Sequence, residues 1–78
     1  MATDDDVVEA AADAAEDVIF ARLSVSEIED YDVTVTFEQQ VLDVDVYVEA
    51  PDASVDEERV AEDAALAARG AVDDLFGE

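Results

Sequence analysis

The chain has 78 residues and carries 24 acidic side chains against three arginines, which gives a net charge of −21. It contains neither cysteine nor histidine, which excludes disulfides and zinc sites with nitrogen or sulfur ligands. A chain of this length predicts one domain, spanning residues 1–78, with a small core. We also expect no cofactor.

The charge predicts a protein adapted to high salt. At low ionic strength, so many like charges destabilise a compact chain, whereas in molar salt the Debye length falls to about 3 Å. Abundant Asp and Glu, no Lys, and an apolar fraction supplied mainly by Ala and Val are typical of halophilic archaeal proteins. The competing interpretation is an acidic disordered chain. The 51% hydrophobic content and its clear periodicity favour a folded domain.

The same charge bears on location and partners. The first residues lack a basic region, and no apolar run approaches 18 residues, so we expect no signal peptide and no transmembrane span. A cytoplasmic location follows. Nucleic acids and anionic membrane surfaces would repel this chain, because binding them requires basic patches.

A first helix is predicted over residues 4–23, with Thr3 as its N-cap and three aspartates in the first turn, where carboxylates favour the helix dipole. A connector follows, in which Ser26 is expected to cap one short turn and Ile28 to enter the core. The apolar stripe expected on the helix comprises Val8, Ala12, Ala15, Ile19 and Leu23, widened by Ala11 and Val18.

Two strands are predicted over residues 32–38 and 41–49, because apolar and polar residues alternate with period two. Gln39 and Gln40 lie between them, which predicts a tight hairpin. A two-residue and a four-residue loop both remain open, since neither Asn-Gly nor Asp-Gly is present.

A second helix is predicted over residues 55–76, where Ser54 and Glu57 match a capping box. Pro51 ends the strand before it, because proline lacks a ladder donor. The apolar seam expected on this helix comprises Val60, Ala64, Ala67, Ala71 and Leu75, joined by Ala61, Ala68 and Val72.

The element order predicts an α+β fold, a two-layer αββα arrangement with both terminal helices on one face of a central antiparallel β-hairpin. The hairpin has one apolar and one polar face, and each helix has a single apolar stripe. Because a lone hairpin leaves two open edges, two states are open. One is a homodimer through edge pairing, and the other is a monomer whose edges are guarded by acidic side chains.

No catalytic residue is predicted, and we expect the protein not to be an enzyme. Without His, Cys or Lys, neither nucleophile–base pairs nor Schiff-base chemistry can be built. Asp43 and Asp45 share a strand face, roughly 6–7 Å apart. A weak divalent-cation site there is the alternative hypothesis; a solvated acidic surface is the simpler interpretation.

The favoured hypothesis is a non-enzymatic protein-interaction module, whose partner is another protein or a second copy of the chain. Tyr47 lies on the polar face of the hairpin, and exposed aromatic residues are common in partner contacts. Thr34 and Thr36 are expected on the same face as further contact residues. The simpler interpretation of Tyr47 is an amphipathic side chain that lies across its neighbours.

Three segments stand out between and within the acidic helices: residues 18–23 (VIFARL), 26–33 (SEIEDYDV) and 43–49 (DVDVYVE). In these segments the chain resembles a small family of uncharacterised archaeal, including haloarchaeal, proteins of about 80 residues. The resemblance would cover nearly the whole chain. It implies two terminal helices on one side of a central hairpin. It also implies genes located beside those for the prefoldin β subunit and a small subunit of a tRNA-modifying complex, hence a housekeeping role near protein folding or translation.

Overall fold

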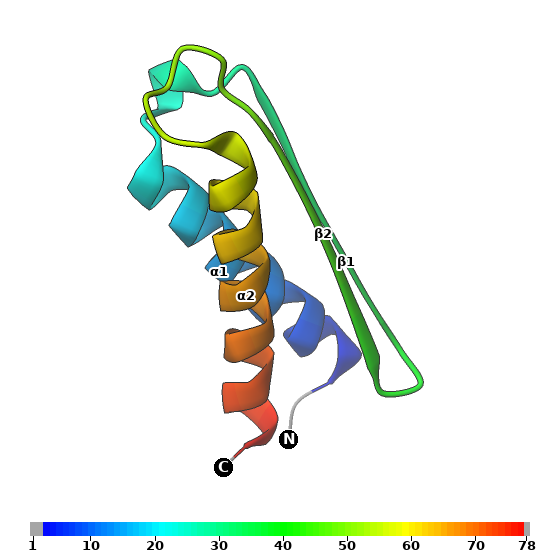
Figure 1. Cartoon of the computed structure of the whole chain (residues 1–78). Coiled ribbons are helices and arrows are strands. Elements are labelled where there is room, and N and C mark those ends of the chain that lie inside the picture. Colours follow the sequence, from blue (N-terminus) through cyan, green and yellow to red (C-terminus); the bar gives the residue numbers. More distant parts are fainter. Residues whose placement is uncertain (1–2, 78) are drawn as a thin grey trace.

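The computed structural model describes residues 3–77, which fold as two helices on one face of an antiparallel hairpin (Figure 1). The predicted two-layer αββα fold is confirmed. The molecule is elongated, measuring 41 × 20 × 16 Å, with one hydrophobic core between the layers. In chain order, the elements are α1 (Asp4–Arg22), a 3-10 helix (Val25–Glu27), β1 (Asp30–Glu38), β2 (Val41–Glu49) and α2 (Glu57–Phe76).

Helix α1 begins at a capping box. Thr3 Oγ1 accepts a hydrogen bond from the Asp6 N–H at 3.2 Å, and the Asp6 carboxylate accepts one from the Thr3 N–H at 3.1 Å. These bonds satisfy two backbone donors that the first turn leaves without partners. The predicted cap is therefore confirmed, and the helix ends one residue earlier than predicted, at Arg22 with Leu23 as its C-cap.

The buried stripe of α1 differs from the predicted one. The residues without solvent exposure lie four apart, whereas Val8 and Ala12 are only half-buried. Ala11, Ala15, Ile19 and Leu23 are buried as predicted. The prediction was wrong for Val8 and Ala12, because nearly every position on this side of the helix is apolar, so periodicity alone allows a shift of one residue. The buried stripe comprises Val7, Ala11, Ala15 and Ile19.

The connector after α1 is capped by Ser24 rather than by Ser26. Ser24 occupies the N-cap position of the 3-10 helix, and its N–H donates to Glu27 Oε1 at 3.0 Å. Ile28 is half-buried and packs against the core, as expected.

Strands β1 and β2 pair in a register that closes on a two-residue turn, with Glu38 opposite Val41. Gln39 and Gln40 both have positive φ, 50° and 69°, as a type I′ turn requires. This settles the open turn length. Strand β2 matches its predicted bounds, and β1 begins two residues before the predicted start, at Asp30.

Because two glutamines occupy left-handed positions in the turn, residues better suited to these positions should stabilise the protein. A residue with a Cβ in the left-handed region costs roughly 1–2 kcal/mol, which glycine avoids and asparagine reduces. We expect the double change Gln39→Asn and Gln40→Gly to raise the free energy of unfolding by about 1–2 kcal/mol. Urea unfolding in constant molar KCl measures the change. The control is Gln39→Ala with Gln40→Ala, which keeps both Cβ atoms and should give no gain.

Helix α2 begins at Glu57 with Asp56 as its N-cap, so the expected capping box between Ser54 and Glu57 is not formed. The Asp56 carboxylate accepts from the Glu58 N–H at 3.0 Å. The side chain of Glu57 instead accepts a hydrogen bond from the N–H of Ala50, at the end of β2. This hydrogen bond connects the two ends of the loop between β2 and α2. We attribute to it the start of α2 at Glu57, two residues after the predicted start.

The two helices pack through small side chains. Ala11 and Ala15 of α1, with Ala64 and Ala68 of α2, are fully buried, which allows the helix axes to approach closely. The buried seam of α2 is Val60, Ala64, Ala68 and Val72. The expected seam members Ala67 and Ala71 are only half-buried, and Leu75 is exposed because it lies beyond the end of the packed stripe.

Candidate functional site

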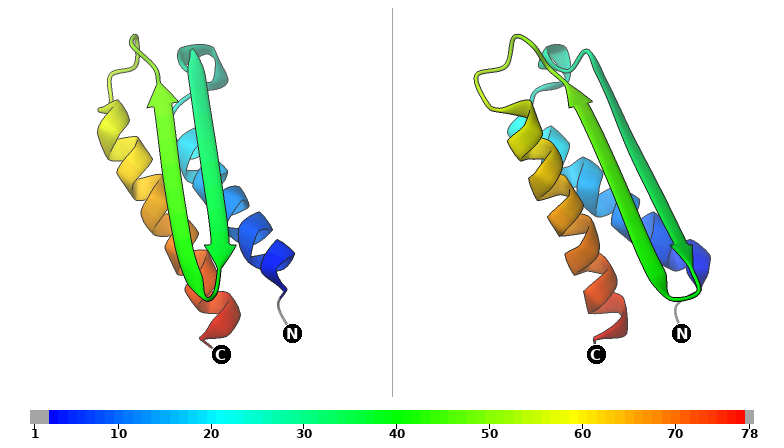
Figure 2. Two further views of the ribbon diagram at one scale, coloured as in Figure 1. Left: turned by 90° about the vertical axis from the view of Figure 1, so that its right-hand side faces the viewer. Right: turned by 45° about the vertical axis from the view of Figure 1, so that its right-hand side comes forward.

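The outer face of the hairpin is the surface that the helices leave open (Figure 2). Apolar side chains of both strands point inward and are buried or half-buried against the helices. The alternate residues point outward and are mostly exposed. Those of β1 are Asp30, Asp32, Thr34, Thr36 and Glu38, and those of β2 are Val41, Asp43, Asp45, Tyr47 and Glu49.

The register joins the two sets of candidate residues into one surface. Thr34 lies opposite Asp45, and Thr36 lies opposite Asp43. The predicted partner-contact threonines and the predicted cation-site aspartates are therefore cross-strand neighbours, roughly 5 Å apart. Sequence reasoning placed all four on polar strand faces but could not pair them, because the pairing depends on the length of the turn.

Tyr47 lies on the same outer face, in β2 opposite Asp32 of β1, and 52% of its area is exposed. Its hydroxyl donates a hydrogen bond to Glu49 Oε1 at 3.1 Å. The Glu49 carboxylate, through this bond and its charge, raises the pKa of Tyr47 above its ordinary value. The bond stabilises the neutral phenol and holds the ring along the strand.

This contact predicts a titration. With Tyr31→Phe, Tyr47 is the only tyrosine, and absorbance of the phenolate in molar KCl should show a pKa above that of a free tyrosine. The contact is fully present below the ordinary pKa and is lost as pH rises through the raised pKa. Glu49→Gln removes the carboxylate charge and should bring the pKa down. An unchanged titration in that variant would contradict the assignment to Glu49.

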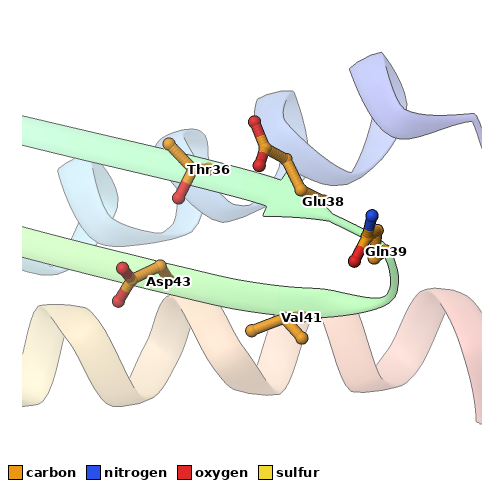
Figure 3. A pocket seen from close by; sticks show the side chains of 5 residues that line it. All are labelled: Thr36, Glu38, Gln39, Val41 and Asp43. Atoms are coloured by element: carbon orange, nitrogen blue, oxygen red, sulfur yellow. The ribbon is translucent and has the colours of Figure 1, made fainter.

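A shallow hollow of about 260 Å³ lies on the outer face near the turn (Figure 3). In the close-up, side chains of β1 and β2 flank it from the two strands, and the helices lie behind the sheet. Its lining combines hydroxyl, amide, carboxylate and apolar groups. The lining residues are Thr36, Glu38, Gln39, Val41 and Asp43.

A second hollow of about 250 Å³ lies between β2 and the first turns of α2. Val46, Tyr47 and Val48 line one side, and Glu57, Glu58 and Ala61 line the other. Tyr47 thus borders a recess on the helix side of β2, while the hollow at the turn lies farther along the same strand. The outer face therefore has one hollow, near the turn, and its exposed Tyr47 ring also borders a recess between β2 and α2.

The geometry adds no support for a divalent-cation site. Within residues 3–77, no three acidic side chains come close enough together to hold a metal ion. Asp43 and Asp45 supply two carboxylates on an exposed strand, whereas Ca²⁺ takes six to eight oxygen ligands. The second carboxylate pair on this face, Asp30 and Glu49, lies at the other end of the hairpin.

Val41 is a surface residue that sequence reasoning missed. It is 66% exposed and lies opposite Glu38, beside the hollow at the turn. The alternation of the strand could have indicated this, because Val41 is an even number of residues from Asp43, Asp45 and Tyr47 and so points to the same face.

Neither helix in residues 3–77 has the length and the apolar content that a membrane span requires.

Three comparisons place the chain among known proteins. Residues 3–75 match the family described as "Protein of unknown function (DUF3194)". The chain is 53% identical over 74 residues to an uncharacterised protein of the haloarchaeon Natronomonas pharaonis, covering 95% of this chain and 88% of that protein. A solution structure of a hypothetical protein from Methanothermobacter thermautotrophicus is similar, with a TM-score of 0.71, 25% identity, and coverage of 99% of this chain and 91% of that one. The expected gene neighbourhood stays a prediction.

Proposed function

Since the chain belongs to the DUF3194 family, whose description assigns no activity, we propose its function from its own surface. It is a non-enzymatic protein-binding module that presents the outer face of the hairpin to a protein partner. The observation that carries the proposal is Tyr47, a half-exposed aromatic ring on the one sheet face that neither helix covers. Buried aromatic anchors contribute much of the binding energy in protein interfaces.

The charges of the outer face define the partner. Six carboxylates surround Tyr47 and the two threonines, and no arginine lies on either strand. A partner must therefore supply Lys, Arg or backbone N–H donors around an apolar pocket that accepts the ring. In molar salt only groups in direct contact interact strongly, because the Debye length is about 3 Å. Long-range electrostatic attraction between the two proteins is therefore lost. Shape complementarity and ion pairs in direct contact determine which partner binds. The six carboxylates belong to Asp30, Asp32, Glu38, Asp43, Asp45 and Glu49.

Capture of a binding partner from a cell lysate in molar KCl, with the captured amount measured, tests the proposal. Tagged wild-type protein and two variants are used as baits: Tyr47→Ala, and the control Val25→Ala, which changes an apolar residue that is 76% exposed and lies outside the hairpin. We expect one protein to be captured by wild type and by Val25→Ala, and its purified form to bind Tyr47→Ala at least about tenfold more weakly. Capture that Tyr47→Ala leaves unchanged, or no saturable binding, contradicts the proposal.

The alternative function, divalent-cation binding at Asp43 and Asp45, is checked separately by calorimetric titration with Ca²⁺ and Mg²⁺ in molar KCl. A saturable heat that disappears when both residues are changed to asparagine would support it. No saturable heat removes it.

A further inference from the structure

The outward face of α2 carries an exposed leucine. Successive residues of an α-helix are separated by about 100° around the axis, so Leu66 points almost opposite to the buried Ala64 and Ala68. Leu66 is 63% exposed. This surface lies away from the hairpin and is separate from the face assigned to a protein partner.

Around Leu66 the surface charge is balanced, in a chain whose net charge is −21. Arg59 and Asp73 lie within about 20° of Leu66 around the axis, Glu62 lies about 40° away, and Arg69 and Asp63 lie about 60° away on opposite sides. The exposed residues among them, Arg59, Glu62, Arg69 and Asp73, carry two positive and two negative charges. Asp63 is half-buried and forms an ion pair with the third arginine, Arg22, at 2.7 Å.

Neither arginine of this face pairs with a carboxylate among residues 3–77. Among residues 3–77, the ion pair between Arg22 and Asp63 is the only one within 4.0 Å. Arg59 and Arg69 therefore have no carboxylate contact among the described residues, although Glu62 and Asp73 lie on the same helix face. Two cations remain available for carboxylates of another molecule.

The order of the charges is self-complementary about Leu66. Arg59 lies seven residues before it and Asp73 seven residues after it, each about 10.5 Å along the axis. Glu62 lies four residues before it and Arg69 three after it. If a second α2 lies antiparallel against the first, with the twofold axis at Leu66, each Arg59 faces Asp73 of the second copy, and each Arg69 faces Glu62 of the second copy. Gly70, where an added Cβ would meet nothing within 4 Å, adds no bulk to this face.

We propose that two copies of the chain associate through the outward faces of α2, antiparallel, with Leu66 against Leu66 and four intermolecular ion pairs around it. The face meets the requirement of a twofold interface, in which the same patch must complement itself. A partner of other sequence would need the same alternation of charges at the same spacing.

Pairing through hairpin edges is the competing arrangement, and its charges oppose it. A four-stranded sheet made from two hairpins would place the acidic outer faces side by side. In the register that pairs Asp43 of one β2 with Asp45 of the other, like charges lie opposite each other, and the register that pairs Asp30 with Asp32 does the same for β1. Like charges on neighbouring strands are destabilising, and these strands carry no arginine to compensate.

Charge reversal in two separate variants tests the proposal by sedimentation equilibrium in molar KCl. Arg59→Asp places like charges against Asp73 of the second copy, and Asp73→Arg places like charges against Arg59. Each variant alone should dimerise about tenfold more weakly than wild type, because two exposed contacts become repulsive. An equimolar mixture should recover the wild-type affinity. In the mixed dimer the introduced aspartate of one variant faces the introduced arginine of the other, and the native Arg59 and Asp73 that remain face each other.

The design separates specific contacts from general repulsion. Residues 59 and 73 are about 21 Å apart along the helix and cannot contact each other within one chain. A recovered dimer affinity in the mixture therefore arises from contacts between molecules. Asp73→Arg makes the net charge less negative and would favour dimers if net charge alone mattered. The mixed dimer keeps the total charge of the wild-type dimer. Both reversals suit the helix dipole, with the new aspartate near the N-terminus and the new arginine near the C-terminus, and circular dichroism checks the fold.

Two further variants complete the test. Leu66→Asp should abolish the dimer, whereas Tyr47→Ala, on the partner face, should leave it unchanged. A monomeric wild type at all concentrations, no recovery in the mixture, or tighter dimers of Asp73→Arg alone would each overturn the proposal. A dimer that survives Leu66→Asp would also overturn it.

Discussion

Transfer from molar KCl to about 10 mM KCl is expected to unfold this protein reversibly. At 0.01 M the Debye length is about 30 Å, which exceeds two of the three dimensions of the molecule, so nearly every carboxylate repels every other. At 1 M it is about 3 Å, and only charges in contact interact. The core that opposes the net charge of −21 is small, and five of the twelve buried residues among positions 3–77 are alanines.

Far-UV circular dichroism during dialysis measures this transition, with recovery of helical signal when KCl is restored. A matched variant tests the electrostatic cause. Glu9, Asp13 and Asp17 lie four apart on the exposed side of α1, where like charges repel. Changing them to Gln, Asn and Asn should lower the KCl concentration at the midpoint. Full helicity of the wild type at 10 mM KCl would contradict the prediction.

The second large effect is expected from Ile19→Ala, which should lower the free energy of unfolding by about 2–5 kcal/mol. Ile19 is the largest side chain that is fully buried among the described residues. Neighbouring alanines cannot extend into the cavity that the substitution leaves, so relaxation recovers little of the loss. For a small domain this approaches the entire stability.

Urea unfolding at constant molar KCl measures the loss, because urea is uncharged and leaves the screening unchanged. The control is Val25→Ala, at a position that is 76% exposed, where the change should stay within about 0.5 kcal/mol. A loss below about 1 kcal/mol for Ile19→Ala would show that the core does not depend on this side chain.

Most of the candidate surface could be predicted from the sequence. The period-two alternation in residues 32–38 and 41–49 assigned Tyr47, Thr34 and Thr36 to the polar face, and the structure places them there. It could not reveal that Thr36 lies opposite Asp43, because a loop of different length would have changed every cross-strand pair. It also gave no reason to expect that Glu49 would bind the Tyr47 hydroxyl.

Some features follow from sequence alone because their causes are local. Thr3 and Asp6 form a capping box across one turn, and strand alternation depends only on backbone geometry. Other features needed the tertiary structure, because several solutions were locally equivalent. Val7 rather than Val8 is buried because the apolar side of α1 is wider than its contact with α2 and β1. Similarly, Asp56 replaces Ser54 as the cap of α2 because the contact between Glu57 and Ala50 sets where the helix begins.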